Sequence, residues 1–433
     1  MFSFSSFFSG GVPKFGLGRT STAGVIDIPS VDVHDVETST DKRDRRLKHL
    51  LKLNHANFSI LWNNRRFHNH TPHLLGSAYL LGGSADHLTN IYEHAAHQGH
   101  EEWKDSPGEI ALHDYRDFLG KLAAHFLFER GKKNEPNSYP MFSCLTAGLG
   151  HPLIHLGYAY ELSSREVGME ALGLVATCYD PKLATLLEAN SSSTSVVSTA
   201  NSRGYSTSDP FEIFARVQAD KRLDSHFTKL GDDNLSRLLS DKSLTSILVE
   251  HFNAWEIAEP KAAFEQSQRL ATALLISTSP EKPICGHGYD FFLLHVLTTS
   301  HAVRIIIPFL PAEHHIPLLR EWFLITLALY IAQLRPTTSG QQVKDYDLKG
   351  KTWEDAGKLA LESEHKFDEH YVKGIRAMKA AAYLWGDDDR FFEKAAVKFA
   401  VEFEEWQGFS QEAAEHVKKD ADGRNRRGSL GAL

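Results

Sequence analysis

The chain has few cysteines and no apolar run long enough to cross a membrane. Its three cysteines, Cys144, Cys178 and Cys285, are far apart and form no CxxC spacing, which argues against a disulfide framework and a thiolate zinc site. The most continuous apolar stretch, residues 323–334, has 12 residues, whereas a membrane-spanning helix needs about 18. We therefore expect a cytoplasmic protein without a membrane span, in which residues 323–334 form a buried core helix.

The sequence also lacks the motifs of common cofactor and phosphate sites. No GxGxxG follows a predicted strand, which argues against a Rossmann site for flavin or nicotinamide. The P-loop, HExxH and GxSxG motifs and the zinc deaminase signature are absent as well. With 47 Lys and Arg against 55 Asp and Glu, the chain has a net charge of −8 and no basic excess for binding phosphates. These absences disfavour nucleic acid binding, phosphoryl transfer and common hydrolase chemistry.

Helical patterning dominates the chain instead. From about residue 45 onward, apolar positions recur at spacings of three and four residues, which is typical of amphipathic helices. Three pairs are typical of helix starts, namely Ser106 with Glu109, Ser163 with Glu166, and Asp209 with Pro210. We predict an all-α fold with a single large, bundle-like helical domain at residues 45–417. A mobile N-terminal tail and lead-in (1–44) and a mobile C-terminal tail (418–433) are expected to flank it.

The chain is rich in histidine, with 24 His against 4 Met. Four segments place a histidine inside an otherwise apolar helical pattern. In the first segment, His73 shares an inward helical face with Gly76, a residue without a side chain that leaves room for a ligand. His68 and His70 precede this helix and are interpreted as caps or as hydrogen-bond donors to the ligands. The first candidate metal ligand is therefore His73.

The second and third segments add histidines in the same kind of setting. His151 and His155 are spaced i and i+4 around a helix start, so that both can bind one metal ion or one can orient the other. The helical face selects His155 over His151, one turn earlier. In the third segment His295 follows Phe291 by one turn, and an imidazole in so apolar a run must be hydrogen-bonded or metal-bound.

The fourth segment combines a histidine with a lysine. His370 lies on an inward apolar stripe, and Lys373 lies at i+3 on the edge of that stripe. A buried, unpaired ammonium is costly, so Lys373 is expected to be paired, deprotonated or chemically modified. Carbamylation by carbon dioxide would convert this cation into an anion with oxygen donors.

Taken together, the four segments predict a metal centre in the helical core. A single such histidine is more often a satisfied core residue, but helical bundles build metal sites from facing side chains of separate helices. A di-iron carboxylate site is disfavoured, because only residues 362–365 supply the ExxH spacing that it needs twice. A non-catalytic helical binding module with purely structural histidines stays open. Most remaining histidines, such as His94, His97 and His315, fall in polar surroundings and are expected at the surface.

The same residues resemble the questin oxidase-like family of fungal aromatic-polyketide pathways, over about residues 45–405. The resemblance rests on Leu50-Leu51 with Asn54-His55, on Phe67-His68-Asn69-His70 followed by His73-Leu74-Leu75 and Tyr79-Leu80-Leu81-Gly82, on the specific block HPLIHLGY at residues 151–158, and on His370 with Lys373 and Arg376-Ala377. It implies an oxygenase that opens the central ring of an anthraquinone-type aromatic polyketide with dioxygen.

The resemblance also indicates the cofactor. It implies a non-haem iron(II) held by histidines and a modified lysine, which we assign to His73, His155, His295, His370 and carbamylated Lys373. An alternative is an NADPH-dependent Baeyer–Villiger oxidase acting on the same substrates, and NADPH can also serve as a reductant. The expected partners are the small aromatic substrate and dioxygen, and neither nucleic acid nor a membrane. The aromatic residues expected to contact the substrate are Tyr158, Phe291, Phe292 and Trp385.

Overall fold

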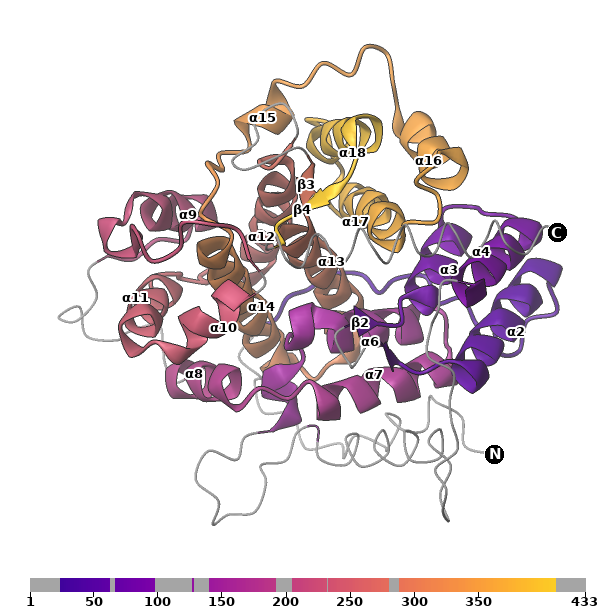
Figure 1. Ribbon diagram of the computed structural model, residues 1–433, viewed down its shortest axis with the longest axis horizontal. Coiled ribbons are helices and arrows are strands. Elements are labelled where there is room, and N and C mark those ends of the chain that lie inside the picture. Colours follow the sequence, from indigo (N-terminus) through magenta and orange to yellow (C-terminus); the bar gives the residue numbers. More distant parts are fainter. Residues whose placement is uncertain are drawn as a thin grey trace, which may run out of the picture.

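Helices make up most of the part of the chain that the structure describes (Figure 1). The computed structural model describes residues 24–62, 67–97, 127, 140–191, 205–231, 233–279 and 288–409. Within these residues the strands form only two short pairs. β1 (Leu61–Trp62) pairs antiparallel with β2 (Phe67–His68), and β3 (Tyr289–Asp290) pairs parallel with β4 (Trp406–Gln407). The prediction of an all-α fold is therefore confirmed.

The helices surround a central element, α13, which crosses the middle of the molecule in Figure 1. In chain order the α-helices are α2 (Lys42–Asn57), α3 (Thr71–Leu80), α4 (Ala85–His97), α6 (His151–Glu161), α7 (Arg165–Thr177), α8 (Pro181–Ser191), α9 (Pro210–Ala219), α10 (Asp233–Ser240), α11 (Lys242–Asn253), α12 (Pro260–Ile276), α13 (Phe291–Ile306), α14 (His315–Ala332), α15 (Gln341–Lys344), α16 (Trp353–Glu362), α17 (Glu369–Trp385) and α18 (Phe391–Glu402). Helices α2 to α4 lie on one side of α13 in this view, and α8 to α11 lie on the other.

Two long apolar helices form the centre of the core. The segments Phe291–Phe309 and Ala312–Ala332 are long and apolar enough to cross a membrane, but 89% of each apolar window is buried inside the protein. Core helices of soluble proteins show the same combination. Residues 323–332 are all buried in α14, which confirms the predicted core helix for this stretch.

Helices α3, α6, α13 and α17 pack around one another, and glycines allow the closest of these contacts. α13 packs against α6 and α17, and α3 packs against the same two helices. A Cβ at Gly374 of α17 would lie 2.9 Å from Leu294 Cδ1 of α13. Gly150, at the start of α6, has a φ of +77°, and a Cβ there would collide with the Thr299 side chain of α13. Both glycines therefore bring helix starts close to α13.

The predicted helix starts have mixed outcomes. Asp209 is confirmed as the N-cap of α9, where its carboxylate accepts a hydrogen bond from the Phe211 N–H at 2.9 Å. The prediction for Ser163 is wrong by one residue, because Ser164 is the N-cap of α7 and Ser163 adopts a φ of +52° outside the helix. The pair Ser106 and Glu109 lies outside the described residues.

Residues 24–41 pack on the helical body ahead of α2. Ile26 and Val36 are buried, and the Ile26 N–H donates to His315 Nδ1 at 3.2 Å. The Arg304 guanidinium of α13 donates to the backbone carbonyl of Pro29 at 2.9 Å. The surface position expected for His315 is therefore wrong, since this lead-in segment covers its ring. Residues 1–23 and 410–433 lie outside the described residues.

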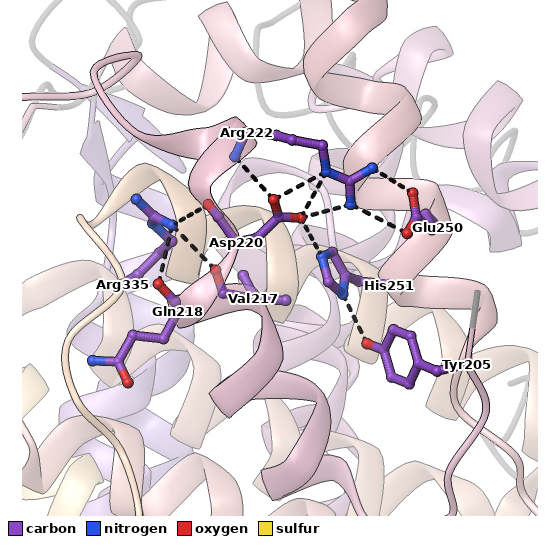
Figure 2. A network of polar contacts seen from close by, with 8 residues as sticks. All are labelled: Tyr205, Val217, Gln218, Asp220, Arg222, Glu250, His251 and Arg335. Carbon is purple, nitrogen blue, oxygen red and sulfur yellow. Dashed lines mark hydrogen bonds and ion pairs between the residues drawn. The ribbon is translucent and has the colours of Figure 1, made fainter.

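A network of polar side chains fastens α9 and α11 to the segment after α14 (Figure 2). Its side chains come from Tyr205, Asp220, Arg222, Glu250, His251 and Arg335. Asp220 is central, because its carboxylate accepts hydrogen bonds from Arg222 and lies 3.0 Å from His251 Nε2. Hydrogen bonds from Arg222 hold the pKa of Asp220 well below its usual range. Arg335 donates to three backbone carbonyls at the end of α9. We interpret this network as a structural cross-link, since its charged groups pair with one another.

Candidate metal centre

Four histidine rings from four helices meet in the core. One nitrogen atom of each of His70, His151, His295 and His370 lies within 4.8 Å of the corresponding atom of every other ring. The ring centroids of His70 and His370 are 4.6 Å apart, and those of His151 and His295 are 4.9 Å apart. We call this group the inner histidines. Four convergent imidazoles form a donor set that first-row transition metals bind well.

The inner histidines lie at the beginnings of their helices. His70 is the N-cap residue of α3, and His151 is the first residue of α6. His370 is the second residue of α17, and His295 is the fifth residue of α13. Pro72 is the second residue of α3, in the first turn, where a proline is tolerated in a helix. Four helix N-termini, each with a partial positive charge, therefore come together at the cluster.

Backbone carbonyls orient two of the inner rings. His151 Nδ1 lies 2.6 Å from the Gly148 carbonyl oxygen, and His295 Nδ1 lies 2.7 Å from the Phe291 carbonyl oxygen. A carbonyl oxygen only accepts hydrogen bonds, so in each ring Nδ1 carries the proton and Nε2 keeps its lone pair. Histidine ligands of metal sites commonly show this arrangement, in which an oxygen behind the ring orients it toward the metal.

A carboxylate orients the other two inner rings. Glu369 Oε1 lies 3.1 Å from His70 Nδ1 and 3.5 Å from His370 Nδ1. A carboxylate oxygen beside Nδ1 favours the tautomer with the proton on Nδ1 in these rings as well, which leaves Nε2 for the cluster. The Nε2 atoms of His70 and His151 are 2.6 Å apart. With both protons on Nδ1, neither Nε2 has a proton to donate, and a metal ion held by these two residues would remove the repulsion between their lone pairs.

The electrostatics of the cluster favour uncharged imidazoles. Burial, followed by the charges of Lys373 and neighbouring histidines, lowers the pKa of His295 and His370 well below the ordinary value of 6.5. Burial also lowers the pKa of His151 in the same way. Neutral imidazole is the form that binds metals. Among the described residues, the buried Nε2 atoms of His295 and His370 have no hydrogen-bond partner, so a metal ion would satisfy both of them.

Lys373 lies beside the inner histidines with an unpaired amine. Its side chain is buried, and its Nζ has no hydrogen-bond partner among the described residues. Burial lowers the pKa of Lys373 to about 8, although the charges of Glu369 and Asp368 act in the opposite direction. A substantial fraction of the amine is therefore uncharged at slightly alkaline pH. An uncharged lysine amine is a nucleophile, and it is the form that reacts with carbon dioxide.

Two of the predicted ligands, His73 and His155, lie outside this cluster. The structure brings His295 and His370 together with His70 and His151, each one turn earlier than the residue selected from the sequence. His73 and His155 do point inward and are completely buried, as their helical faces predict. Their ring nitrogens, however, contact each other, since His73 Nε2 lies 2.7 Å from His155 Nδ1.

Glu170 of α7 continues this outer pair toward the surface. Its Oε2 lies 3.6 Å from His155 Nε2, and its Oε1 lies 2.9 Å from His55 Nδ1 of α2. Burial alone would raise the pKa of Glu170, but the contacts with His155 and His55 outweigh it and lower the pKa to about 2. We call His73, His155, Glu170 and His55 the outer chain. It braces α2, α3, α6 and α7 behind the inner histidines.

The low pKa of Glu170 predicts a pH-dependent contribution to stability. Its folded-state pKa of about 2 lies below the ordinary 4.5, so ionised Glu170 stabilises the fold above pH 4.5 and loses this effect as the pH falls toward 2. The shift corresponds to roughly 3 kcal/mol. Glu170→Gln should therefore lower the free energy of unfolding by about that amount at pH 7, in urea denaturation. The difference from the unsubstituted protein should shrink below pH 4.5.

Glu166→Gln provides a matched control on the same helix. Glu166 lies 3.6 Å from Lys52 at a partly exposed position, and exposed pairs of this kind contribute about 0–1 kcal/mol. Equal stability of the two variants at pH 7 would contradict the role of Glu170 in the outer chain.

The aromatic residues predicted to contact the substrate are only partly brought together. Phe291 flanks the cluster, with its ring centroid 4.7 Å from that of His295 and 4.5 Å from that of His370. The ring centroid of Phe292 lies 5.8 Å from that of Phe291. Tyr158 stacks on His73 of the outer chain at 5.0 Å. Phe291 is therefore the predicted aromatic residue that borders the inner histidines directly.

Trp385 lies away from the cluster. It is the last residue of α17, where its indole N–H donates to Gln268 Oε1 at 2.6 Å. Fifteen residues of helix separate it from His370, which corresponds to about 22 Å. Trp406 is closer to the site, with its ring centroid 6.0 Å from that of His370. No sequence pattern indicated Trp406, because β3 and β4 bring it to the site from 36 residues further along the chain.

Glu369 and Glu170 were also not identified as site residues from the sequence. A carboxylate next to His370 was a local signal that could have indicated Glu369. For Glu170, the spacing within α7 carries no such signal, because its partners come from α2 and α6. The ExxH sequence at residues 362–365 remains outside the site, with His365 packed against Tyr371 and Phe403.

The fold and the site define a class of all-α proteins in which four buried histidines cluster beside a lysine. Residues 67–378, which include all four inner histidines and Lys373, match the questin oxidase-like family. The chain belongs to this family. The match confirms the resemblance found in the sequence.

Several relatives match most of the chain. It is 23% identical over 410 residues to questin oxidase of Aspergillus fumigatus, covering 87% of this chain and 89% of the relative. It is 23% identical over 364 residues to Baeyer-Villiger oxidase AgnL3 of Paecilomyces divaricatus, covering 76% and 77%. It is 22% identical over 405 residues to Baeyer-Villiger oxidase ptaJ of Pestalotiopsis fici, covering 84% and 85%. All three are named oxidases, which supports an oxidoreductase.

Proposed function

We propose that this protein is a non-haem iron(II) oxygenase that opens the central ring of an anthraquinone-type aromatic polyketide with dioxygen. The convergence of four imidazole Nε2 atoms beside an unpaired buried lysine, in a family of oxidases, carries the proposal. We place the catalytic domain at residues 45–417. The relatives named questin oxidase and Baeyer-Villiger oxidase support the oxidative chemistry and the substrate class.

We assign the metal to the inner histidines His70, His151, His295 and His370, with Lys373 as a fifth ligand. Four neutral imidazoles lack the anion that iron(II) oxygenases commonly obtain from a carboxylate. The uncharged Lys373 amine can supply one by attacking carbon dioxide, which forms an N–C bond and releases a proton to leave a carbamate. Bound iron(II) would supply electrons to dioxygen. The residues around it hold the ion and exclude water.

The surroundings of the site favour negative charge and an aromatic ligand. The helix N-termini that meet at the cluster stabilise an anion such as a carbamate or a substrate phenolate. Phe291 and Trp406, both partly exposed, offer aromatic faces next to His370. We propose that the fused rings of the substrate pack against these two residues, with Phe292 behind them. Tyr158 orders the outer chain, since it stacks on His73 and its hydroxyl pairs with Ser77.

An NADPH-dependent Baeyer–Villiger oxidase is the second candidate, since relatives carry that name. Such an enzyme would insert oxygen next to a ring ketone of the same substrate class. The chain has no GxGxxG after a strand, so in our first proposal NADPH acts only as a reductant of the substrate or the iron. The non-catalytic binding module is the third alternative.

Elemental analysis of the purified protein, combined with oxygen uptake, tests the proposal. We expect about one iron per chain and uptake of dioxygen with a chemically reduced anthraquinone in the absence of NADPH. Uptake that strictly requires NADPH with reduced substrate would favour the Baeyer–Villiger oxidase. Protein that binds no metal after anaerobic incubation with ferrous salt would contradict both the iron site and the proposed reaction.

A further inference from the structure

The carboxylate of Glu369 lies between two of the inner histidines. Its Oε1 is 3.1 Å from His70 Nδ1 and 3.5 Å from His370 Nδ1. The two rings stand nearly perpendicular, at 76°, and they come from the starts of different helices, α3 and α17. A single oxygen atom can therefore fix the orientation of ligands from two elements that are 300 residues apart in the chain.

The inner histidines thus divide into two chemically different pairs. Backbone carbonyls, which are neutral, accept the Nδ1 protons of His151 and His295. The carboxylate of Glu369 faces Nδ1 of His70 and of His370 instead. A carboxylate behind an imidazole raises the basicity of the ring and strengthens it as a ligand. It also adds a negative charge close to the metal, which favours the more highly charged ion.

Helix capping does not account for the position of Glu369. The N-cap of α17 is Asp368, whose Oδ1 accepts hydrogen bonds from the backbone N–H groups of His370 and Tyr371, each at 2.9 Å. Asp368 Oδ2 accepts a hydrogen bond from the Trp406 indole at 2.7 Å. The helix start is therefore complete without the Glu369 side chain, and the two histidine rings remain as its close partners.

We propose that Glu369 is a positioning residue that orients His70 and His370 together and lowers the reduction potential of the bound metal. The role rests on the proposed metal site. A lower potential would make a bound ferrous ion a better electron donor. The Glu369 side chain is 28% exposed. His70 and His370, which it contacts, are therefore the inner histidines nearest to solvent.

Three substitutions separate the orienting role of Glu369 from its charge. Glu369→Ala removes both, Glu369→Gln keeps an oxygen acceptor without the charge, and Glu369→Asp restores the charge on a shorter side chain. Glu364→Gln is the matched control, because Glu364 is 88% exposed and lies 3.8 Å from His365 outside the cluster. Each metal-free variant is titrated with cobalt(II), followed by its visible absorption, and the iron-loaded forms are titrated for their midpoint potential.

The alanine variant should bind cobalt(II) about 10–100-fold more weakly than the unsubstituted protein, with an altered spectrum. The Glu369→Gln variant should keep more of the cobalt affinity than the alanine variant. It should raise the midpoint potential of the bound iron by about 59 mV, which is a tenfold shift of the ferric–ferrous equilibrium toward the ferrous form. The Glu369→Asp variant should recover part of the cobalt affinity and part of the lower iron potential. Glu364→Gln should change neither quantity. Unchanged affinity, spectrum and potential in all Glu369 variants would overturn the role of Glu369 while leaving the metal site intact. Failure of the unsubstituted protein to bind cobalt or iron would overturn the metal site itself.

Discussion

Alanine at His70 or His151 is expected to remove bound iron, whereas alanine at His73 or His155 should leave most of it in place. The inner rings direct Nε2 into the cluster, and losing one ligand should cost more than the 10–100-fold in affinity that is typical of losing an outer partner. In the outer pair, His73 Nε2 and His155 Nδ1 contact each other at 2.7 Å, and both rings lie one turn behind the inner histidines. Iron per chain, measured after gel filtration in the presence of a weak chelator, distinguishes the two groups.

His97→Ala serves as the control for nonspecific loss of iron, since His97 is exposed on α4. Its iron content should equal that of the unsubstituted protein. Each variant also needs a helical circular dichroism spectrum like that of the parent, because all four rings are packed in the core. Iron that is retained in His151→Ala and lost in His155→Ala would restore the ligands selected from the helical faces and contradict the cluster seen in the structure.

Lys373→Met should make the metal-free protein more stable and at the same time remove most of the proposed oxygenase activity. Burial lowers the pKa of Lys373 from 10.5 to about 8, so below pH 8 the folded state carries an unpaired ammonium that the unfolded state solvates. This penalty corresponds to roughly 3 kcal/mol and should disappear in the methionine variant. Loss of the proposed carbamate should lower turnover by roughly a hundredfold or more, as loss of a key electrostatic group does.

The pH dependence provides a second measurement of the same effect. In carbonate-free buffer, the metal-free parent should gain stability as the pH rises from 8 to 10.5, because the folded state no longer has to hold the charge. The methionine variant should lack this gain. Lys379→Met is the control, since Lys379 is exposed on the same helix. Incubation with ¹³C-labelled bicarbonate should give a carbamate resonance in the parent and none in Lys373→Met. A variant that is destabilised and keeps full activity would show that Lys373 is only a packing residue.

The proposed metal site lies at helix beginnings, whereas many helical metalloproteins bind metals between helix middles. Di-iron bundles project carboxylates and histidines from the middle of long helices. Here His151, His295 and His370 lie within the first five residues of their helices, and His70 lies directly before α3. The partial positive charge of four helix N-termini stabilises a buried anionic ligand at this place. A neutral donor set completed by a carbamate is consistent with such a setting.

Much of the architecture follows from local patterns. The recurrence of apolar residues every three or four positions identified the helices, because each helix must bury one face. The same reasoning identified His73, His155, His295 and His370 as inward-facing, and all four are buried. The pattern could not identify His70, which precedes α3 and therefore has no helical face. It also favoured His155, whereas the structure places His151 in the inner cluster, since one turn barely changes the face on which a residue lies.

The sequence by itself determined the helical class, the segments that face the core and the family to which the chain belongs. Only the tertiary structure decided which rings form the inner cluster and which form the outer chain. The physical reason is that periodicity sets the direction of a side chain relative to its own helix, whereas the direction of a ring nitrogen depends on its neighbours. The carbonyls of Gly148 and Phe291 and the carboxylate of Glu369 turn Nε2 toward a common point. These contacts exist only once α3, α6, α13 and α17 have packed together.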